Sequence, residues 1–190
     1  MTTQPIREKK EIKRICEYFE GRSETRNLVL FMFGIHTALR ISDILKLRWG
    51  DIFDFKTAQF KNEFELTEKK TKKFKVVALN SKLRDVIRRL FRQNKPSADT
   101  FLFAHPTKNH AISRIQAYRI IKAASAAVGL KPLSCHSLRK TFGYHLWKKG
   151  TSLAIIMDIY NHSSFGITQR YLGITQDERN NAYRCLNFGL

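Results

Sequence analysis

The stretch that decides the fold is residues 28–52, LVLFMFGIHTALRISDILKLRWGDI. Its first part, Leu28 to Ile35, is apolar nearly all round, and a helix without a polar face belongs at the centre of a domain. Arg40 then stands directly before a second apolar segment that starts near Ser42 and Asp43. An arginine among buried residues is costly unless it is paired or reaches a cleft. We therefore expect a central helix that leads into a site containing Arg40, with Asp43 as its nearby partner. A structural ion pair at a helix start is the alternative.

Composition and charge indicate a polyanionic partner. The chain has 190 residues and a mass of 22.2 kDa, which suits one well-buried domain. Its 35 Lys and Arg against 16 Asp and Glu give a formal charge of +19, and the pI is about 10.2, as in nucleic-acid binders. Hydrophobic residues make up 43%, which excludes a disordered basic tail, and no apolar run is long enough to span a membrane.

The cysteines and the N-terminal segment indicate the compartment. Three cysteines are widely separated, and residues 1–13 have no apolar signal-peptide core. These features favour a reducing, cytoplasmic location with direct access to nucleic acid. No cluster of His, Cys, Asp and Glu has metal-ligand spacing, so we expect neither a metal nor a cofactor.

Periodicity predicts a mostly α domain of the α+β class, with one small antiparallel β-sheet. Helices are expected over about 7–19, 23–35, 42–47, 81–92, 113–128, 136–149, 152–160 and 175–186, with Ser23 and Ser81 as caps. Alternating apolar residues predict the sheet over about 51–80, with a basic stretch near a turn. No linker-like segment divides the chain, so residues 1–190 are expected to form a single domain.

Two further polar groups are candidates for chemistry. His136 and Arg139, three residues apart, would lie on one helix face and contact the same phosphate. Arg139 would act as a bidentate hydrogen-bond donor, and His136 as a donor or general acid–base. His162 is followed nine residues later by Tyr171, whose phenol needs neighbouring cations to act as a nucleophile. Taken separately, each group has a plain explanation, namely a surface His–Arg pair and a tyrosine that anchors a loop.

Together the groups are far more specific than any one of them. Their order along the chain resembles the catalytic domain of the tyrosine recombinases, the phage integrase family. Three boxes carry the resemblance: 37–52 (TALRISDILKLRWGDI), 133–142 (LSCHSLRKTF) and 161–174 (NHSSFGITQRYLGI). The likeness runs from about residue 6 to the C-terminus. It implies the tyrosine recombinase catalytic-domain fold and a site-specific recombinase or integrase that cleaves and rejoins DNA strands through a 3′-phosphotyrosine, without a metal.

The resemblance also implies a role for each matching residue. Tyr171 matches the nucleophile that joins a DNA 3′-phosphate, and Arg40 and Arg139 match the pair that clamps the scissile phosphate. His136 matches the general base or hydrogen-bond partner, and His162 matches the position that contacts a non-bridging oxygen. Such groups would stabilise the negative charge of the transition state.

The basic stretch matches the family's hairpin lysine. Lys70 matches the lysine that protonates the leaving 5′-oxygen, but its neighbours Lys69, Lys72 and Lys73 are close enough in sequence to compete for that role. The alternative is a basic hairpin tip that grips DNA phosphates. Asp43 matches the acidic position that supports the first arginine.

The sequence departs from the family pattern in two places. Asn161 precedes His162 where family members commonly have glycine, and asparagine tolerates left-handed backbone angles better than most residues. We expect no N-terminal DNA-gripping (core-binding) domain, as in the short recombinases that invert fimbrial promoter segments; a fragment of a longer integrase is the alternative. We expect double-stranded DNA as the partner, with self-association on it as a dimer or tetramer synapse. The helix over 175–186 would pack on a neighbouring protomer or on its own domain.

Other functions remain open at this stage. A catalytically silent DNA-binding relative or excision accessory protein is opposed by the complete residue set. A nickase or topoisomerase of the same chemistry differs only in lacking strand exchange. A metal-dependent transposase would need three carboxylates, and Asp51 and Asp54 are more simply turn or cap residues.

Overall fold

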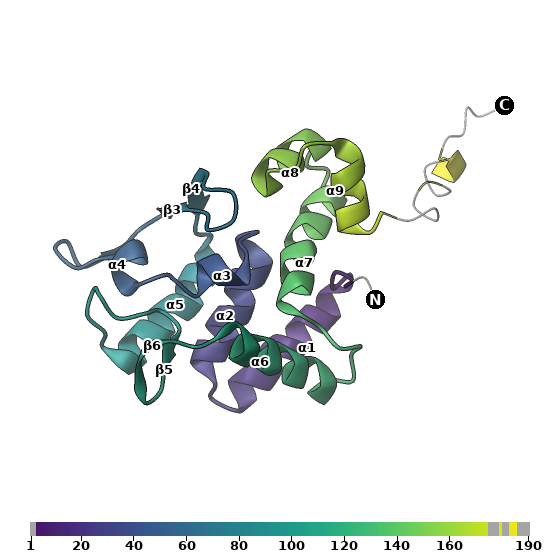
Figure 1. Ribbon diagram of the computed structural model, residues 1–190. Helices are drawn as coiled ribbons and strands as arrows, with labels where there is room; N and C mark the ends of the chain where they lie inside the picture. The colour runs from purple at the N-terminus through teal and green to yellow at the C-terminus, as the bar shows by residue number, and fades with distance from the viewer. Residues whose placement is uncertain (1–2, 175–178, 180–182, 186–190) are drawn as a thin grey trace.

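The computed structural model describes residues 3–174, 179 and 183–185, and its elements are drawn in Figure 1. Its helices are α1 (Lys9–Gly21), α2 (Thr25–His36), α3 (Ile41–Ile44), α4 (Trp49–Ile52), α5 (Ser81–Asn94), α6 (Arg114–Ala127), α7 (Cys135–Lys148), α8 (Leu153–Tyr160) and α9 (Phe165–Leu172). Its strands are β1 (Phe53–Asp54), β2 (Gln59–Phe60), β3 (Glu63–Thr67), β4 (Phe74–Ala78), β5 (Ala104–His105) and β6 (Lys108–Ala111).

Helix α2 is the central helix that its apolar sequence predicts. It packs against α1, α5, α6 and α7, and its Phe31 and Phe33 have no exposed surface. The Phe33 ring meets Phe103 edge to face, with centroids 5.7 Å apart. Gly34 lets α7 come close, because a Cβ there would lie only 2.6 Å from Leu138 Cδ1. The helix that carries two of the predicted site residues is thus seated directly on the core.

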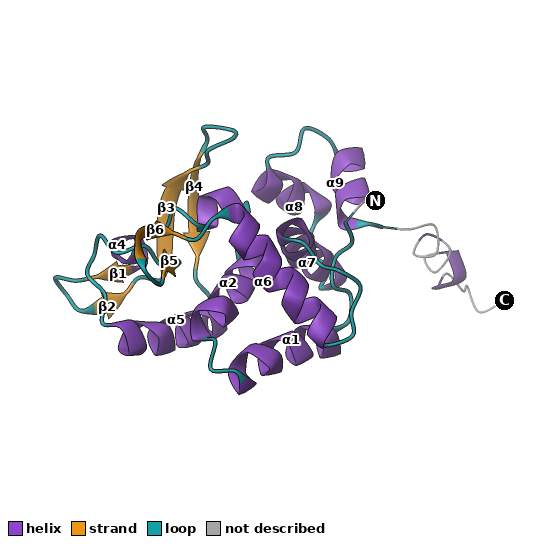
Figure 2. Cartoon of the chain, turned by 60° about the horizontal axis from the view of Figure 1, so that its bottom comes forward, coloured by secondary structure: helices purple, strands orange, loops and turns teal. Residues whose placement is uncertain are grey.

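The predicted mostly α fold with small antiparallel β-structure is confirmed, but the strands do not form one sheet. They form three separate two-stranded antiparallel sheets, β1–β2, β3–β4 and β5–β6. Figure 2 shows the strands gathered on one side of the helical body. The third pair, over 104–111, lies outside the predicted range of 51–80, because strands of two and four residues are too short to show an alternating pattern.

Several helix ends differ from the expectation. Asn80, not Ser81, caps α5, since its side chain accepts a hydrogen bond from the Leu83 amide (2.9 Å). Ser23 is not a cap either; it has a positive φ of 56° in the turn before α2. Most of the helix expected over 175–186 lies outside the described residues.

Helix α9 was not predicted at all, although it carries Tyr171. It begins after Ser164, whose side chain accepts from the Ile167 amide, and it ends at Gly173, which has a φ of 71°. Phe165 and Ile167 are 51% and 44% exposed, so the segment lacks the clean apolar face that periodicity detects. Within the described ranges, no helix is both long and apolar enough to cross a membrane.

Candidate active site

Helix α7 supplies His136 and Arg139. Ser134 begins the helix with a capping box, in which its side chain accepts a hydrogen bond from the Ser137 amide and the Ser137 hydroxyl oxygen accepts one from the Ser134 amide. The Arg139 side chain is only 4% exposed and its Cζ lies 4.8 Å from the centre of the Tyr160 ring. Tyr160, fully buried, donates a hydrogen bond to the Arg139 carbonyl (2.6 Å). Both the backbone and the side chain of Arg139 are therefore held in place.

Tyr171, on α9, lies beside both histidines. Its ring centroid is 5.0 Å from that of His136 and 5.0 Å from that of His162, with an edge-to-face arrangement in each case. The Tyr171 hydroxyl is buried, and no described group meets it with good hydrogen-bond geometry, although the Arg139 guanidinium approaches it. Burial raises the pKa of Tyr171 to about 12, although the charges of Arg139 and Arg40 act to lower it. Such a phenol is protonated at neutral pH and needs a base to become a nucleophile.

Both histidines have the properties of a base. Loss of solvent around His136 and the positive charges of Lys140 and Arg139 lower its pKa below the ordinary value of 6.5. Burial and Arg139 lower the pKa of His162 in the same direction. The His162 ring stacks on Tyr160, and its Nδ1 is 3.1 Å from Thr168 Oγ1. The two imidazoles are therefore neutral near pH 7 and able to accept a proton.

The two arginines converge on a buried glutamate. Arg40 ends the loop before α3, and its Nη1 lies 2.9 Å from Glu68 Oε1; Arg139 Nη1 lies 3.9 Å from the same oxygen. Glu68 has no exposed surface. The structure thus pairs Arg40 with Glu68 rather than with Asp43, which was the expected partner. Asp43 instead accepts a hydrogen bond from the backbone amide of Lys69 (3.0 Å) and holds the hairpin.

A small cavity opens in front of the arginines. It has a volume of about 210 Å³ and is lined by residues of α3, α6 and α7, namely Arg40, Ile41, Ser42, Arg114, Cys135, His136 and Arg139. Both arginines line this cavity, whereas Glu68, with which they pair, does not. In the described part of the chain, no three His, Cys, Asp or Glu side chains are grouped as metal ligands.

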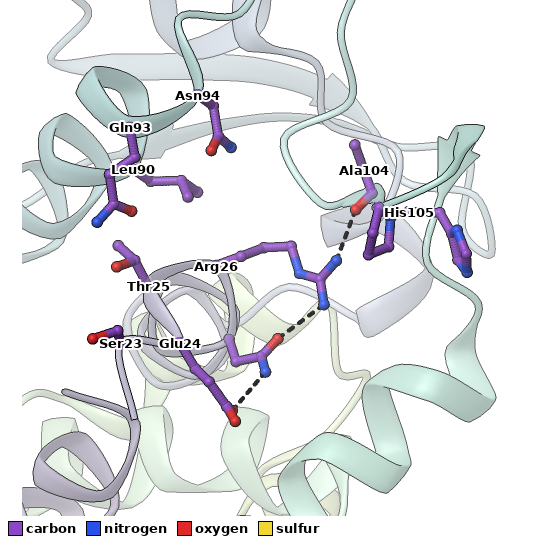
Figure 3. A pocket seen from close by; sticks show the side chains of 11 residues that line it. Ser23, Glu24, Thr25, Arg26, Leu90, Gln93, Asn94, Ala104 and His105 are labelled. Carbon is purple, nitrogen blue, oxygen red and sulfur yellow. Dashed lines mark hydrogen bonds between the residues drawn. The ribbon is translucent and has the colours of Figure 1, made fainter. Parts of the chain in front are cut away.

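A larger cavity of about 490 Å³ contains none of the predicted site residues. It lies around Arg26 on α2, near the end of α5 and His105 (Figure 3). The Arg26 guanidinium donates to the Ala104 carbonyl (2.9 Å) and to Asn27 Oδ1 (3.2 Å). These contacts with its own protein give Arg26 a structural role.

The predicted hairpin lysine does not join the cluster. Lys70 is exposed in the turn between β3 and β4, as are Lys69, Lys72 and Lys73. The lysine that the structure brings in is Lys75, whose Nζ lies 3.9 Å from Glu68 Oε1 and donates to the Ile159 carbonyl.

Sequence reasoning assigned no role to three residues that surround the site: Glu68, Lys75 and Lys140. Strand alternation could have indicated Lys75, because it places this residue on the same face of β4 as buried Val77. Lys140 is 7% exposed, and its Nζ lies 5.2 Å from the centre of the Tyr171 ring and donates to the Thr3 carbonyl (2.7 Å).

Known proteins share this sequence pattern and this fold. A model of the phage integrase family matches residues 7–178. The probable integrase/recombinase YoeC of Bacillus subtilis (strain 168) is 40% identical over 181 residues, and the match covers 95% of each chain. The tyrosine recombinase XerA of Pyrococcus furiosus is 27% identical over 169 residues, which cover 87% of this chain and 56% of that protein.

Solved structures of recombinases have the same architecture. The crystal structure of XerA recombinase matches with a TM-score of 0.75 at 19% identity, covering 96% of this chain and 64% of that one. The structure of XerH recombinase bound to palindromic difH substrate matches with a TM-score of 0.75 at 17% identity, covering 96% of this chain and 53% of that one. The chain thus spans a little over half the length of the longer recombinases. It belongs to the phage integrase family, the family of the tyrosine recombinases.

Proposed function

We propose that this chain is a site-specific DNA recombinase that cleaves and rejoins strands through a covalent bond between Tyr171 and a DNA 3′-phosphate. The observation that carries the proposal is the buried Tyr171 hydroxyl, which no described group meets with good hydrogen-bond geometry and which lies beside two imidazoles and near two arginines. A buried hydroxyl without a well-placed partner is costly, so its retention calls for a functional reason.

The reaction follows from the positions of these groups. The scissile phosphate enters the cavity in front of Arg40 and Arg139, whose charges balance the negative charge that grows on its oxygens. His136 accepts the phenolic proton as the Tyr171 oxygen bonds to phosphorus, and His162 donates to a non-bridging oxygen. The bond from phosphorus to the 5′-oxygen breaks, and that oxygen takes a proton from Lys70, which approaches from the exposed hairpin turn. Rejoining runs the same steps in reverse.

Double-stranded DNA is the proposed partner. The formal charge of +19 suits a polyphosphate surface, and XerH and lambda integrase have been solved bound to their DNA sites, the latter as a dimer. By analogy we propose that protomers of this chain assemble on paired sites. Transfer of the segment 175–186, which the sequence predicts to be helical, to a neighbouring protomer is part of this proposal.

Covalent trapping tests the proposal. The substrate is a pool of nicked duplexes with a randomised core. After cleavage, the short fragment that carries the free 5′-hydroxyl diffuses away at the nick, so the strand cannot be rejoined and the adduct accumulates. The wild-type chain should form a protein–DNA adduct that survives denaturing electrophoresis, Tyr171→Phe should bind the pool and form none, and Tyr18→Phe serves as the matched control. Because side chains supply the positive charge, the adduct should also form in excess EDTA. The same adduct from Tyr171→Phe would refute the assignment, and recovery only with added magnesium would indicate metal-dependent chemistry. Strand exchange between two recovered sites separates a recombinase from a nickase.

A further inference from the structure

We propose that Glu68 and Asn161 form a positioning pair that holds the phosphate-binding arginines, the β3–β4 hairpin and the His162 turn in one reactive arrangement. The inference rests on the proposed function, because it concerns the same site. Neither residue lines the cavity in which the phosphate would bind. Both therefore act through the groups that do contact it.

One carboxylate oxygen of Glu68 gathers the cations. Oε1 lies 2.9 Å from Arg40 Nη1, 3.9 Å from Arg139 Nη1 and 3.9 Å from Lys75 Nζ. These three side chains come from the loop before α3, from α7 and from β4, so a single carboxylate joins three separate elements. Without it, three positive charges would face one another in a poorly solvated space and would repel.

The other oxygen joins the hairpin turn to the end of α8. Oε2 accepts a hydrogen bond from Thr71 Oγ1 in the hairpin turn (2.6 Å) and one from Asn161 Nδ2 (3.2 Å). Burial acts to raise the pKa of Glu68, but the Thr71 hydrogen bond and the charges of Lys75 and Arg40 outweigh it and hold the pKa below its ordinary value. The carboxylate is therefore ionised at neutral pH; its Oε2 accepts both hydrogen bonds, and its Oε1 attracts the three cations by charge.

The contact with Glu68 gives a reason for Asn161 at a position where the family commonly has glycine. It ends α8 in the left-handed conformation, with φ 55° and ψ 43°, a conformation that glycine adopts without strain. The asparagine keeps that backbone conformation and adds an amide group, which reaches Glu68. Its successor in the chain is His162, whose ring lies beside Tyr171. A carboxylate at 68 and an amide at 161 thus complement each other, and they link the arginines to the turn that orients His162.

The burial of Glu68 indicates whether its carboxylate positions the arginines or competes with the DNA phosphate for them. A carboxylate in the cavity would occupy the place of the phosphate and would inhibit the enzyme. Glu68 has no exposed surface and does not line the cavity, so it orients the guanidiniums without occupying the place of the phosphate. Preorganised charges of this kind spare the enzyme a reorganisation during the reaction.

Two variants test the pair by separating cleavage from binding. Glu68→Gln keeps the shape of the side chain and removes its charge, and Asn161→Gly keeps the left-handed turn and removes the amide. Glu63→Gln is the matched control, because Glu63 is an exposed glutamate on β3, the strand that ends directly before Glu68. The measurements are the single-turnover rate of adduct formation with saturating nicked duplex, the Kd for the same duplex, and the thermal midpoint.

We expect Glu68→Gln to slow adduct formation about tenfold and Asn161→Gly about threefold, the scale of one hydrogen bond to a charged group and of one weaker bond. The Kd of Glu68→Gln should be unchanged or lower, because a negative charge near the phosphate is removed. A merely structural role predicts the opposite, with weaker binding and slower cleavage together. The double variant should be slowed by less than the product of the two single effects, and Glu63→Gln should match the wild type.

Wild-type rates in both variants would overturn the inference while leaving the proposed function intact. A parallel loss of affinity and rate in Asn161→Gly would also overturn it, and this variant decides the matter if Glu68→Gln does not fold. Absence of an adduct even from the wild-type chain would refute the proposed function itself, and the positioning role with it.

Discussion

Replacing Gly34 with alanine tests how closely the core sets the position of the site. A Cβ at Gly34 would lie 2.6 Å from Leu138 Cδ1 and 2.8 Å from Leu138 Cβ, whereas carbon atoms in contact prefer about 3.5–4.0 Å. The close Leu138 Cβ cannot rotate away, so α2 and α7 must separate. Overpacking of this kind typically costs about 1–3 kcal/mol, partly offset by the ~1 kcal/mol that alanine gains over glycine within a helix.

Gly21→Ala provides the matched control, since a Cβ at Gly21 would meet nothing within 4 Å. Gly21 ends α1, so its variant gains no more helix propensity than Gly34→Ala, and the difference between the two is a lower bound on the clash of about 1–3 kcal/mol, or roughly 2–12 °C in thermal midpoint for a chain of this size. Because Leu138 lies between His136 and Arg139 on α7, Gly34→Ala should also slow adduct formation; displacements of about 1 Å can cost as much as a hundredfold. Thermal midpoints and single-turnover rates that are the same in the two variants would refute the reasoning.

Two other predictions concern the chemistry of the site and of the hairpin. The lowered pKa of His136 keeps its imidazole neutral near pH 7. The single-turnover rate of adduct formation should therefore be level at neutral pH and fall below pH 6.5, because protonation of the imidazole removes the proton acceptor. A rate that rises in acid would contradict a base at this position. Replacing the exposed Lys72 and Lys73 with alanine should reduce the slope of log K against log salt for duplex binding by up to about one unit each, measured by titration between 50 and 200 mM salt. An unchanged slope would show that the hairpin does not contact the DNA backbone.

Local pattern accounts for the parts of this protein that depend on neighbours in the chain. The apolar run around Phe31 predicts a central helix, because a helix with no polar face has to be buried. A spacing of three places His136 and Arg139 on one side of α7, since helical geometry repeats every 3.6 residues. Asp51 and Asp54 were interpreted as cap and turn residues, and the structure confirms this, with Asp51 accepting from the Arg48 amide and Asp54 from the Lys56 amide.

Only the tertiary structure decided which charges meet. The partner of Arg40 is Glu68, not the nearby Asp43, because the β3–β4 hairpin, held to Asp43 through the Lys69 amide, brings Glu68 and Lys75 to the arginine. Helix α9 depends likewise on packing, since buried Leu172 and Thr168 hold it while exposed Phe165 obscures its periodicity. A sequence pattern records the burial that each residue prefers, but the pairing of distant charges depends on how separate elements pack, and that packing gave this site its buried carboxylate.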